Sequence, residues 1–167
     1  MRVTWRGLEL PTRVEQDKSV MTNKYGRFYI EPFERGFGTT IGNSLRRVLL
    51  SSLEGTAITS IRIEGVGHEF TAIKGVTEDV TEIVLNVKNL VVRLTGEEPK
   101  TMFVSGNKAG VLKAADIEAD SSIEIVDKEQ VIATLTENVK FEMEMVVENG
   151  RGYVPAAERI ALQSRFD

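Results

Sequence analysis

The 167-residue sequence contains no cysteine and a single histidine, His68. Disulfides and thiolate metal sites are therefore excluded, and so is a zinc site built on a pair of histidines. The sequence has no long apolar run, so it gives no sign of secretion or of membrane insertion. A basic excess is also missing: the net charge is −4, whereas domains that chiefly bind nucleic acid usually carry more lysine and arginine. These features favour a cytoplasmic protein without a membrane as partner.

The remaining composition is that of an ordinary globular protein. Hydrophobic residues make up 41% of the chain, which also has 14 glycines. The length suits one domain or two small ones. No internal repeat or low-complexity segment is present.

Residues 39–53 are predicted to form a helix with one apolar stripe. A hydroxyl of Thr39 or Thr40 would cap its start, and Glu54-Gly55 would end it. The stripe has the i, i+4, i+7, i+8, i+11 spacing that is typical of a buried face, and it consists of Ile41, Leu45, Val48, Leu49 and Ser52.

The same helix has more than one distinctive side. Arg46 and Arg47 lie about 100° apart around the axis, so the two cannot share the stripe. Leu50 and Leu53 extend the apolar surface beyond one core contact. This pattern fits a helix that contacts more than its own domain, and it also fits a buried helix whose arginines extend their charged ends to solvent.

The glycines before this helix offer a second hypothesis, a dinucleotide-binding loop. Gly36, Gly38 and Gly42 follow a strand-like run and open a helix, and a second run over 58–63 ends in an acid. The G-x-G-x-x-G fingerprint, however, requires glycine where Ile41 stands, and the later chain does not alternate strand and helix. The sequence favours a protein-binding scaffold over a nucleotide-binding enzyme.

A second helix is predicted over residues 76–90. Its outer acids, Glu78, Asp79 and Glu82, are interpreted as a solvated face. Its apolar stripe consists of Val76, Val80, Ile83, Val84, Val87 and Leu90.

Most of the rest is predicted as short strands. Residues 139–148 are the clearest, because apolar and charged residues alternate as in an antiparallel strand with one wet face. Residues 3–14 are predicted as an irregular edge strand and 108–120 as a charged connection. The other predicted strands are 19–22 and 27–33 around a turn at 23–26, then 57–63, 91–94, 101–104, 122–126 and 131–135.

No set of residues predicts catalysis. His68 has no second histidine for a metal, and Ser51 and Ser52 have no base at a readable spacing. Glu142 and Glu144 are interpreted as solvated. The loop 150–155 is either a connector or an interface, since Arg151 and Tyr153 are residue types that anchor interfaces.

Three blocks of the sequence resemble one known family. The segment PFERGFGTTIGNSLRRVLLSSLEG closely resembles the signature of the bacterial RNA polymerase alpha subunit, in its amino-terminal assembly domain. The resemblance continues in IEGVGHEFTAIKGVTEDVTEIVLNVKNL and in GRGYVPA, in the same order. It covers nearly the whole chain, with residues 1–24 and 95–138 matching more loosely.

The resemblance implies an α+β fold split into two subdomains. Residues 1–54 would be the first part of a dimerisation subdomain, and 55–167 would be an inserted strand-rich subdomain, antiparallel or mixed, with the start of the return segment. It implies a non-catalytic scaffold subunit of DNA-directed RNA polymerase, which is a nucleotidyltransferase whose active site lies in other subunits. Two copies would nucleate assembly of the core enzyme, and no cofactor is implied.

The resemblance also implies roles for individual residues. A dimer interface with a second alpha subunit would use Phe37, Ile41, Leu45, Val48 and Leu49. Contacts with the beta and beta-prime subunits would use Arg46, Arg47, Leu50, Glu82, Lys88, Arg151 and Tyr153. Family members continue past the position of Asp167 into a returning segment and a small DNA-binding domain, so DNA contact is expected only through that further domain.

Overall fold

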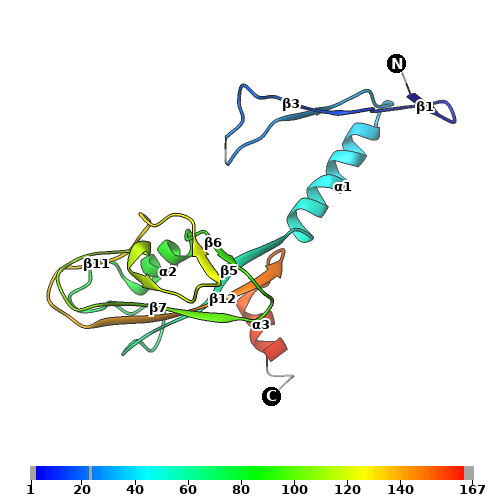
Figure 1. Ribbon diagram of the computed structural model, residues 1–167. Helices are drawn as coiled ribbons and strands as arrows, with labels where there is room; N and C mark the ends of the chain where they lie inside the picture. Colours follow the sequence, from blue (N-terminus) through cyan, green and yellow to red (C-terminus); the bar gives the residue numbers. More distant parts are fainter. Residues whose placement is uncertain (1–2, 23, 164–167) are drawn as a thin grey trace. The chain divides into compact units, whose positions relative to one another are not determined.

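The chain divides between Leu53 and Glu54 into two units, which are described separately below. The computed structural model describes residues 3–22 and 24–163 (Figure 1). The division falls where the sequence changes from a helical pattern to short β runs. That the two units are a dimerisation subdomain and an insert stays a prediction.

The first unit contains two short hairpins and a helix. Its strands are β1 (Val3–Trp5), which pairs with β2 (Leu8–Leu10), and β3 (Val14–Gln16), which pairs with β4 (Phe28–Ile30). Arg6 and Gly7 form the turn between β1 and β2 with φ of 49° and 88°, which suits a two-residue hairpin turn. Residues 3–14 are therefore not the single edge strand that the sequence predicts.

The second hairpin uses a different strand from the one predicted. The partner of β4 is β3, and residues 19–22 contribute only the isolated bridge between Thr22 and Tyr25. Ser19 donates to Asp17 Oδ1 through its backbone N–H and its hydroxyl, at 3.1 and 2.6 Å. This local turn competes with strand pairing. Asn23, in the predicted turn, lies outside the described residues.

Helix α1 (Phe37–Ser51) starts two residues before the predicted helix. Its N-cap is Gly36 in the left-handed region, with φ of 92°, and no side chain caps the helix. Thr39 and Thr40 lie inside the first turn, so the predicted threonine cap is wrong. Ser52 is the C-cap, and its N–H donates to the carbonyl of Val48.

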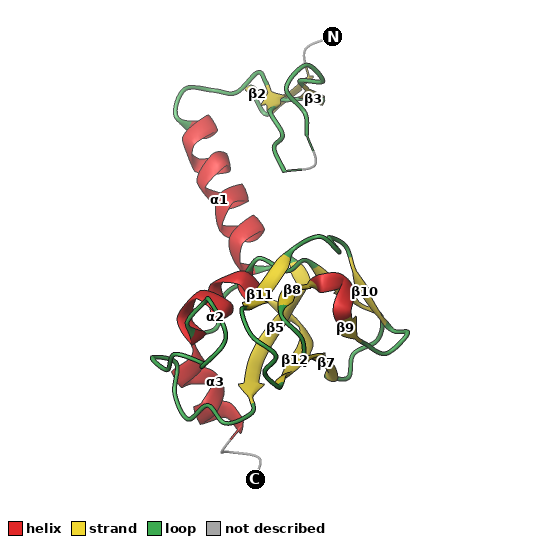
Figure 2. Cartoon of the chain, turned by 90° about the vertical axis from the view of Figure 1, so that its left-hand side faces the viewer, coloured by secondary structure: helices red, strands yellow, loops and turns green. Residues whose placement is uncertain are grey.

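The second unit is built on a four-stranded antiparallel sheet (Figure 2). In spatial order its strands are β5 (Glu54–Ile63), β12 (Phe141–Arg151), β7 (Lys100–Gly106) and β9 (Ile117–Glu118). Glu54-Gly55 begins β5 and is not the end of α1. The predicted alternation of β12 is confirmed, because Phe141, Met143, Met145 and Val147 are buried.

Two smaller antiparallel sheets complete the strands of this unit. They pair β6 (Val92–Leu94) with β10 (Ile123–Ile125), and β8 (Gly110–Lys113) with β11 (Val131–Leu135). The predicted connection 108–120 is wrong, since it holds β8, the 3-10 turn η1 (Ala114–Asp116) and β9. Ala114 is fully buried there, and its N–H donates to the carbonyl of Gln130 at 2.8 Å.

Helix α2 (Val80–Lys88) is shorter than predicted because Asp79 caps it. Asp79 Oδ1 accepts from the N–H of Glu82 at 2.7 Å, and Glu82 Oε2 accepts from the N–H of Asp79 at 3.2 Å. This capping box fixes the start of the helix. The predicted stripe is buried at Val80, Ile83, Val87 and Leu90, partly buried at Val76 and exposed at Val84.

The core of the second unit joins α2 to one face of the large sheet. Its fully covered side chains include Ile83 on α2, Met102 on β7 and Met145 on β12, each with no exposed area. The other buried hydrophobic residues are Ile63, Val80, Val87, Leu90, Val92, Leu94, Val104, Ala114, Ile123, Ile132, Ala133, Leu135, Phe141, Met143 and Val147. This arrangement confirms the predicted α+β class.

A third helix, α3 (Ala156–Gln163), follows β12 and was not predicted. The carbonyl of Pro155 accepts from the N–H groups of Glu158 and Arg159, both at 3.1 Å. Arg159 also forms an ion pair with Glu148 on β12. A proline followed by alanine and glutamate is the sequence signal for this helix start.

Candidate protein-binding surfaces

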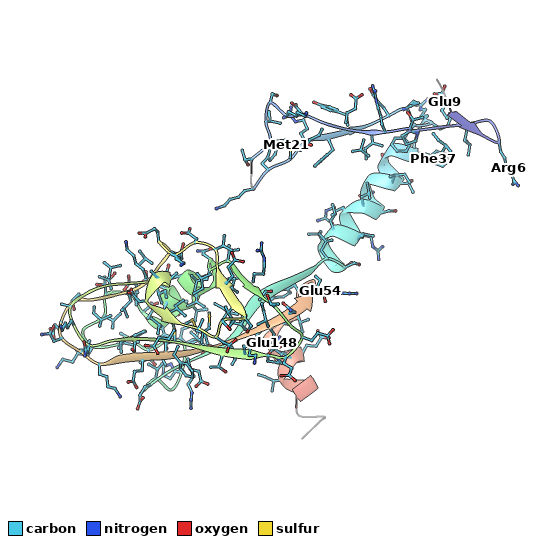
Figure 3. The ribbon with its side chains drawn as sticks, viewed as in Figure 1. Arg6, Glu9, Met21, Phe37, Glu54 and Glu148 are labelled. Atoms are coloured by element: carbon cyan, nitrogen blue, oxygen red, sulfur yellow. The ribbon has the colours of Figure 1, made fainter. Side chains whose placement is uncertain are left out.

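The apolar stripe of α1 is exposed along its whole length. No residue of α1 is buried, and the exposed fraction of its apolar side chains runs from 38% at Ile41 to 60% at Leu50. Phe37, at the start of the helix, is 45% exposed (Figure 3). The burial that the spacing of the stripe indicates is therefore not found within the described chain. The remaining predicted dimer residues, Leu45, Val48 and Leu49, are exposed as well.

The basic side of α1 adjoins this stripe. Arg46 and Arg47 are exposed, and neither forms an ion pair with the described residues of the first unit. Leu50 lies four positions after Arg46 and three after Arg47, so it shares a helix side with both arginines. The structure thus brings these three predicted residues together on one surface.

Two further predicted residues, Glu82 and Lys88, lie at opposite ends of α2. Both are exposed, but they are about 120° apart around the helix and do not form one patch. The carboxylate of Glu82 accepts from the N–H of Asp79 in the capping box. Glu82 is therefore part of the helix start as well as the surface.

Glu78 has a structural role that the sequence analysis missed. Its Oε2 accepts from the N–H of Thr134 at 2.7 Å, and its Oε1 accepts from the hydroxyl of Thr134 at 2.9 Å. These bonds tie the segment before α2 to β11. The interpretation of Glu78 as a solvated acid is wrong, and no spacing in the sequence reveals a partner 56 positions away.

The last pair of predicted residues lies at the end of β12. Arg151 is the final residue of the strand, and its Nη2 is 4.0 Å from Glu54 Oε2 on β5. Tyr153 follows in the turn before α3 and is 84% exposed. The segment 150–155 is thus a strand end and a turn, with an uncovered aromatic side chain.

The single histidine lies in a local turn of the second unit. His68 is exposed, and its Nδ1 accepts from the N–H of Phe70 at 3.2 Å, so it acts in a local turn. In the part of the chain that the structure describes, no three histidine, aspartate or glutamate side chains are placed to hold a metal ion. No described helix has the length and apolar character needed to span a membrane.

The glycine loop does not have the geometry of a dinucleotide-binding unit. Such a unit places the strands before and after the helix in one parallel sheet. Here β4 pairs antiparallel with β3 in a two-stranded sheet, while β5 belongs to the four-stranded sheet of the other unit. The strands on either side of α1 therefore do not form the required pair.

Comparison with known proteins identifies relatives of this chain. It is 56% identical over 158 residues to the DNA-directed RNA polymerase subunit alpha of Rhodopirellula baltica, which covers 95% of this chain and 48% of that protein. It is 51% identical over 152 residues to the subunit of the same name from Geobacter metallireducens, covering 91% and 45%. It is also 51% identical over 152 residues to the subunit of the same name from Maridesulfovibrio salexigens, and this match covers 91% of this chain and 44% of that protein. The chain thus spans about half the length of these relatives.

The family match covers most of the second unit and continues to the last residue. Residues 61–167 match the RNA polymerase Rpb3/RpoA insert domain, which is more than half of the chain. The matched region includes most of the large sheet, α2 and α3. On the strength of this match and of the identities above, the chain belongs to the RNA polymerase Rpb3/RpoA insert domain family.

Proposed function

We propose that this chain is a non-catalytic scaffold part of DNA-directed RNA polymerase, which dimerises and binds the beta and beta-prime subunits. Its family and its relatives, which are named as alpha subunits of that enzyme, support the proposal. The main structural support is that α1 exposes its entire apolar stripe beside Arg46 and Arg47, and neither arginine forms an ion pair with the residues of this unit that the structure describes.

Leaving such a stripe in water is costly. Burial of apolar surface contributes about 25 cal/mol per Å², so a patch of a few hundred Å² corresponds to several kcal/mol. Monomeric proteins rarely leave larger apolar patches uncovered. A second protein surface that covers α1 recovers this free energy, and that is what a scaffold subunit requires.

The two sides of α1 have different partners in this proposal. The stripe packs against a second copy of the chain through Phe37, Ile41, Leu45, Val48 and Leu49. The side with Arg46, Arg47 and Leu50 contacts the beta subunit. Residues 1–54 act as the first part of the dimerisation subdomain, and 55–167 as the insert, which contacts a large subunit through Glu82, Lys88, Arg151 and Tyr153.

The beta-subunit contact is tested with Arg47→Ala. Removing one partner of a buried, hydrogen-bonded charge pair costs on the order of 2–5 kcal/mol, so co-purification with the beta subunit of the same bacterium should fall sharply. The matched control is Arg93→Ala, which removes an exposed arginine from β6. Circular dichroism should be unchanged in both. Wild-type co-purification of Arg47→Ala would contradict this part of the proposal.

The dimer contact is tested separately with Leu49→Asp. A charge in the stripe should abolish concentration-dependent association in sedimentation velocity, because burying an unpaired carboxylate is strongly unfavourable. Val126→Asp is the control, since Val126 is 56% exposed and Leu49 is 58% exposed. If both variants associate like the wild type, the stripe is not a dimer interface.

A further inference from the structure

The large sheet has a polar face with one aromatic residue near its middle. In the strand register, Glu118 on β9, Phe103 on β7, Glu144 on β12 and Arg62 on β5 lie opposite one another across the four strands. Residues directly opposite in antiparallel strands point to the same side of the sheet. Phe103 is 51% exposed, and a glutamate flanks it on each neighbouring strand.

A second row of side chains continues this face. Ser105 on β7 lies opposite Glu142 on β12. Glu64 directly follows the last residue of β5, and its N–H donates to the carbonyl of Glu142 at 3.0 Å, so Glu64 lies in the same row on the other side of Glu142. A hollow of about 590 Å³ is lined by residues of both rows and by the turn at 65–66. Figure 1 shows α2 on the other side of β7 and β12, where the core lies.

The face carries a net negative charge. Arg62 binds Glu144, and Lys140 Nζ lies 2.9 Å from Glu142 Oε2, so each cation is paired with one glutamate. Four glutamates, including Glu64 and Glu118, against these two cations leave a charge of −2. An exposed phenylalanine between carboxylates is a favourable site for a lysine or arginine side chain, because the ring face attracts a cation.

We propose that this surface docks a lysine- or arginine-bearing segment of a partner protein. We call it the acidic sheet face, and it consists of Arg62, Glu64, Phe103, Glu118, Lys140, Glu142 and Glu144. Neighbouring strands are about 4.8 Å apart, so the row from β5 to β9 spans about 14 Å. An extended segment of four residues has this length. The occupant is therefore a polypeptide with more than one cation. The proposal does not depend on the surface of α1.

The test uses the full chain labelled with ¹⁵N and a defined probe. The probe is a seven-residue, acetylated and amidated peptide with lysine or arginine at every second position and glycine between them. The control peptide has glutamate at the same positions. The basic peptide should shift amide resonances of β7, β12 and β9, more weakly as salt is raised, and the acidic peptide should not.

Matched variants show whether the named residues bind the probe. Phe103→Ala should weaken binding about threefold or more, and Glu118→Gln should weaken it by a smaller factor. Phe70→Ala is the aromatic control, because Phe70 is 81% exposed outside this face, and Glu97→Gln is the charge control. Neither control should change the affinity, and circular dichroism should show all four variants folded.

Two results would overturn the proposal. One is the absence of shifts on β7, β12 and β9 at millimolar peptide. The other is a Phe103→Ala affinity no lower than that of Phe70→Ala.

Discussion

Helices α1 and α2 carry the same kind of apolar stripe in opposite surroundings. On α2, Val80, Ile83 and Val87 are at most 4% exposed, whereas no apolar side chain of α1 is less than 38% exposed. The spacing of a stripe therefore shows which side of a helix is apolar. What covers that side depends on the neighbouring elements, and α2 packs against β11 and β5.

The starts of the two helices differ in the same way. A capping box at Asp79 satisfies N–H groups at the start of α2, while α1 begins at Gly36 without a side-chain cap. An isolated helix of 15 residues is marginal in water. The proposal therefore predicts that α1 depends on its partners for stability more than α2 does.

The largest expected difference between the two helices is in the stability lost when one residue of each apolar stripe is truncated. Ile83→Ala should lower the free energy of unfolding of the second unit by about 2–5 kcal/mol, because it opens a cavity in a closely packed core. Leu45→Ala on α1 should change that free energy by less than about 0.5 kcal/mol. Urea unfolding followed by circular dichroism measures both. Equal losses would show that the stripes have the same environment.

Replacing a glycine with alanine should have opposite effects on stability in the two units. A Cβ added at Gly75, where φ is 79°, would lie 2.6 Å from Val139 Cγ1, so Gly75→Ala should cost about 1–3 kcal/mol. Gly42 in α1 has no atom within 4 Å of an added Cβ, so Gly42→Ala should stabilise the helix by up to about 1 kcal/mol. The readouts are urea unfolding for the first and helical circular dichroism for the second.

The third test compares the helix starts. Asp79→Ala removes the cap of α2 and should cost about 1 kcal/mol in urea unfolding. Thr39→Ala should be close to neutral in helical circular dichroism, because Thr39 lies within the first turn of α1 and no side chain caps that helix. A loss of α1 helicity in Thr39→Ala would mean that threonine caps α1 after all.

The smallest effect concerns an exposed ion pair of the second unit, in contrast to Arg46 and Arg47 of α1, which form no ion pair with the residues that the structure describes. A hydrogen bond from Lys140 holds the pKa of Glu142 below its ordinary value of 4.5. A depressed folded-state pKa gives a stabilisation that is present above pH 4.5 and is lost as pH falls through the lower value. Lys140→Ala should raise the pKa of Glu142 in an NMR carboxyl titration, and an unchanged pKa would count against this pairing.

Much of the second unit could be predicted because its strands are locally regular. Strand β12 alternates apolar and charged residues, and the bounds of β11 match the prediction. Strand β8 and the turn η1 were missed, because their charged residues resemble a loop and the burial of Ala114 depends on a partner far along the chain.

The candidate surfaces were only partly predictable. Arg46, Arg47 and Leu50 share a side of α1 as helical spacing requires, whereas Glu82 and Lys88 do not share a side of α2. The acidic sheet face could not be found from the sequence. Glu118 and Phe103 are 15 residues apart and meet only through the register of β7 and β9.

Hydrogen exchange tests the central claim most directly, namely that α1 is an uncovered surface which needs a partner while α2 lies within a finished core. In a dilute monomer, amides of α1 (Phe37–Ser51) should exchange much faster than those of α2 and of β12, and α1 alone should gain protection as the concentration or a bound subunit rises. Strong and equal protection of α1 and α2 in the dilute monomer would contradict the claim.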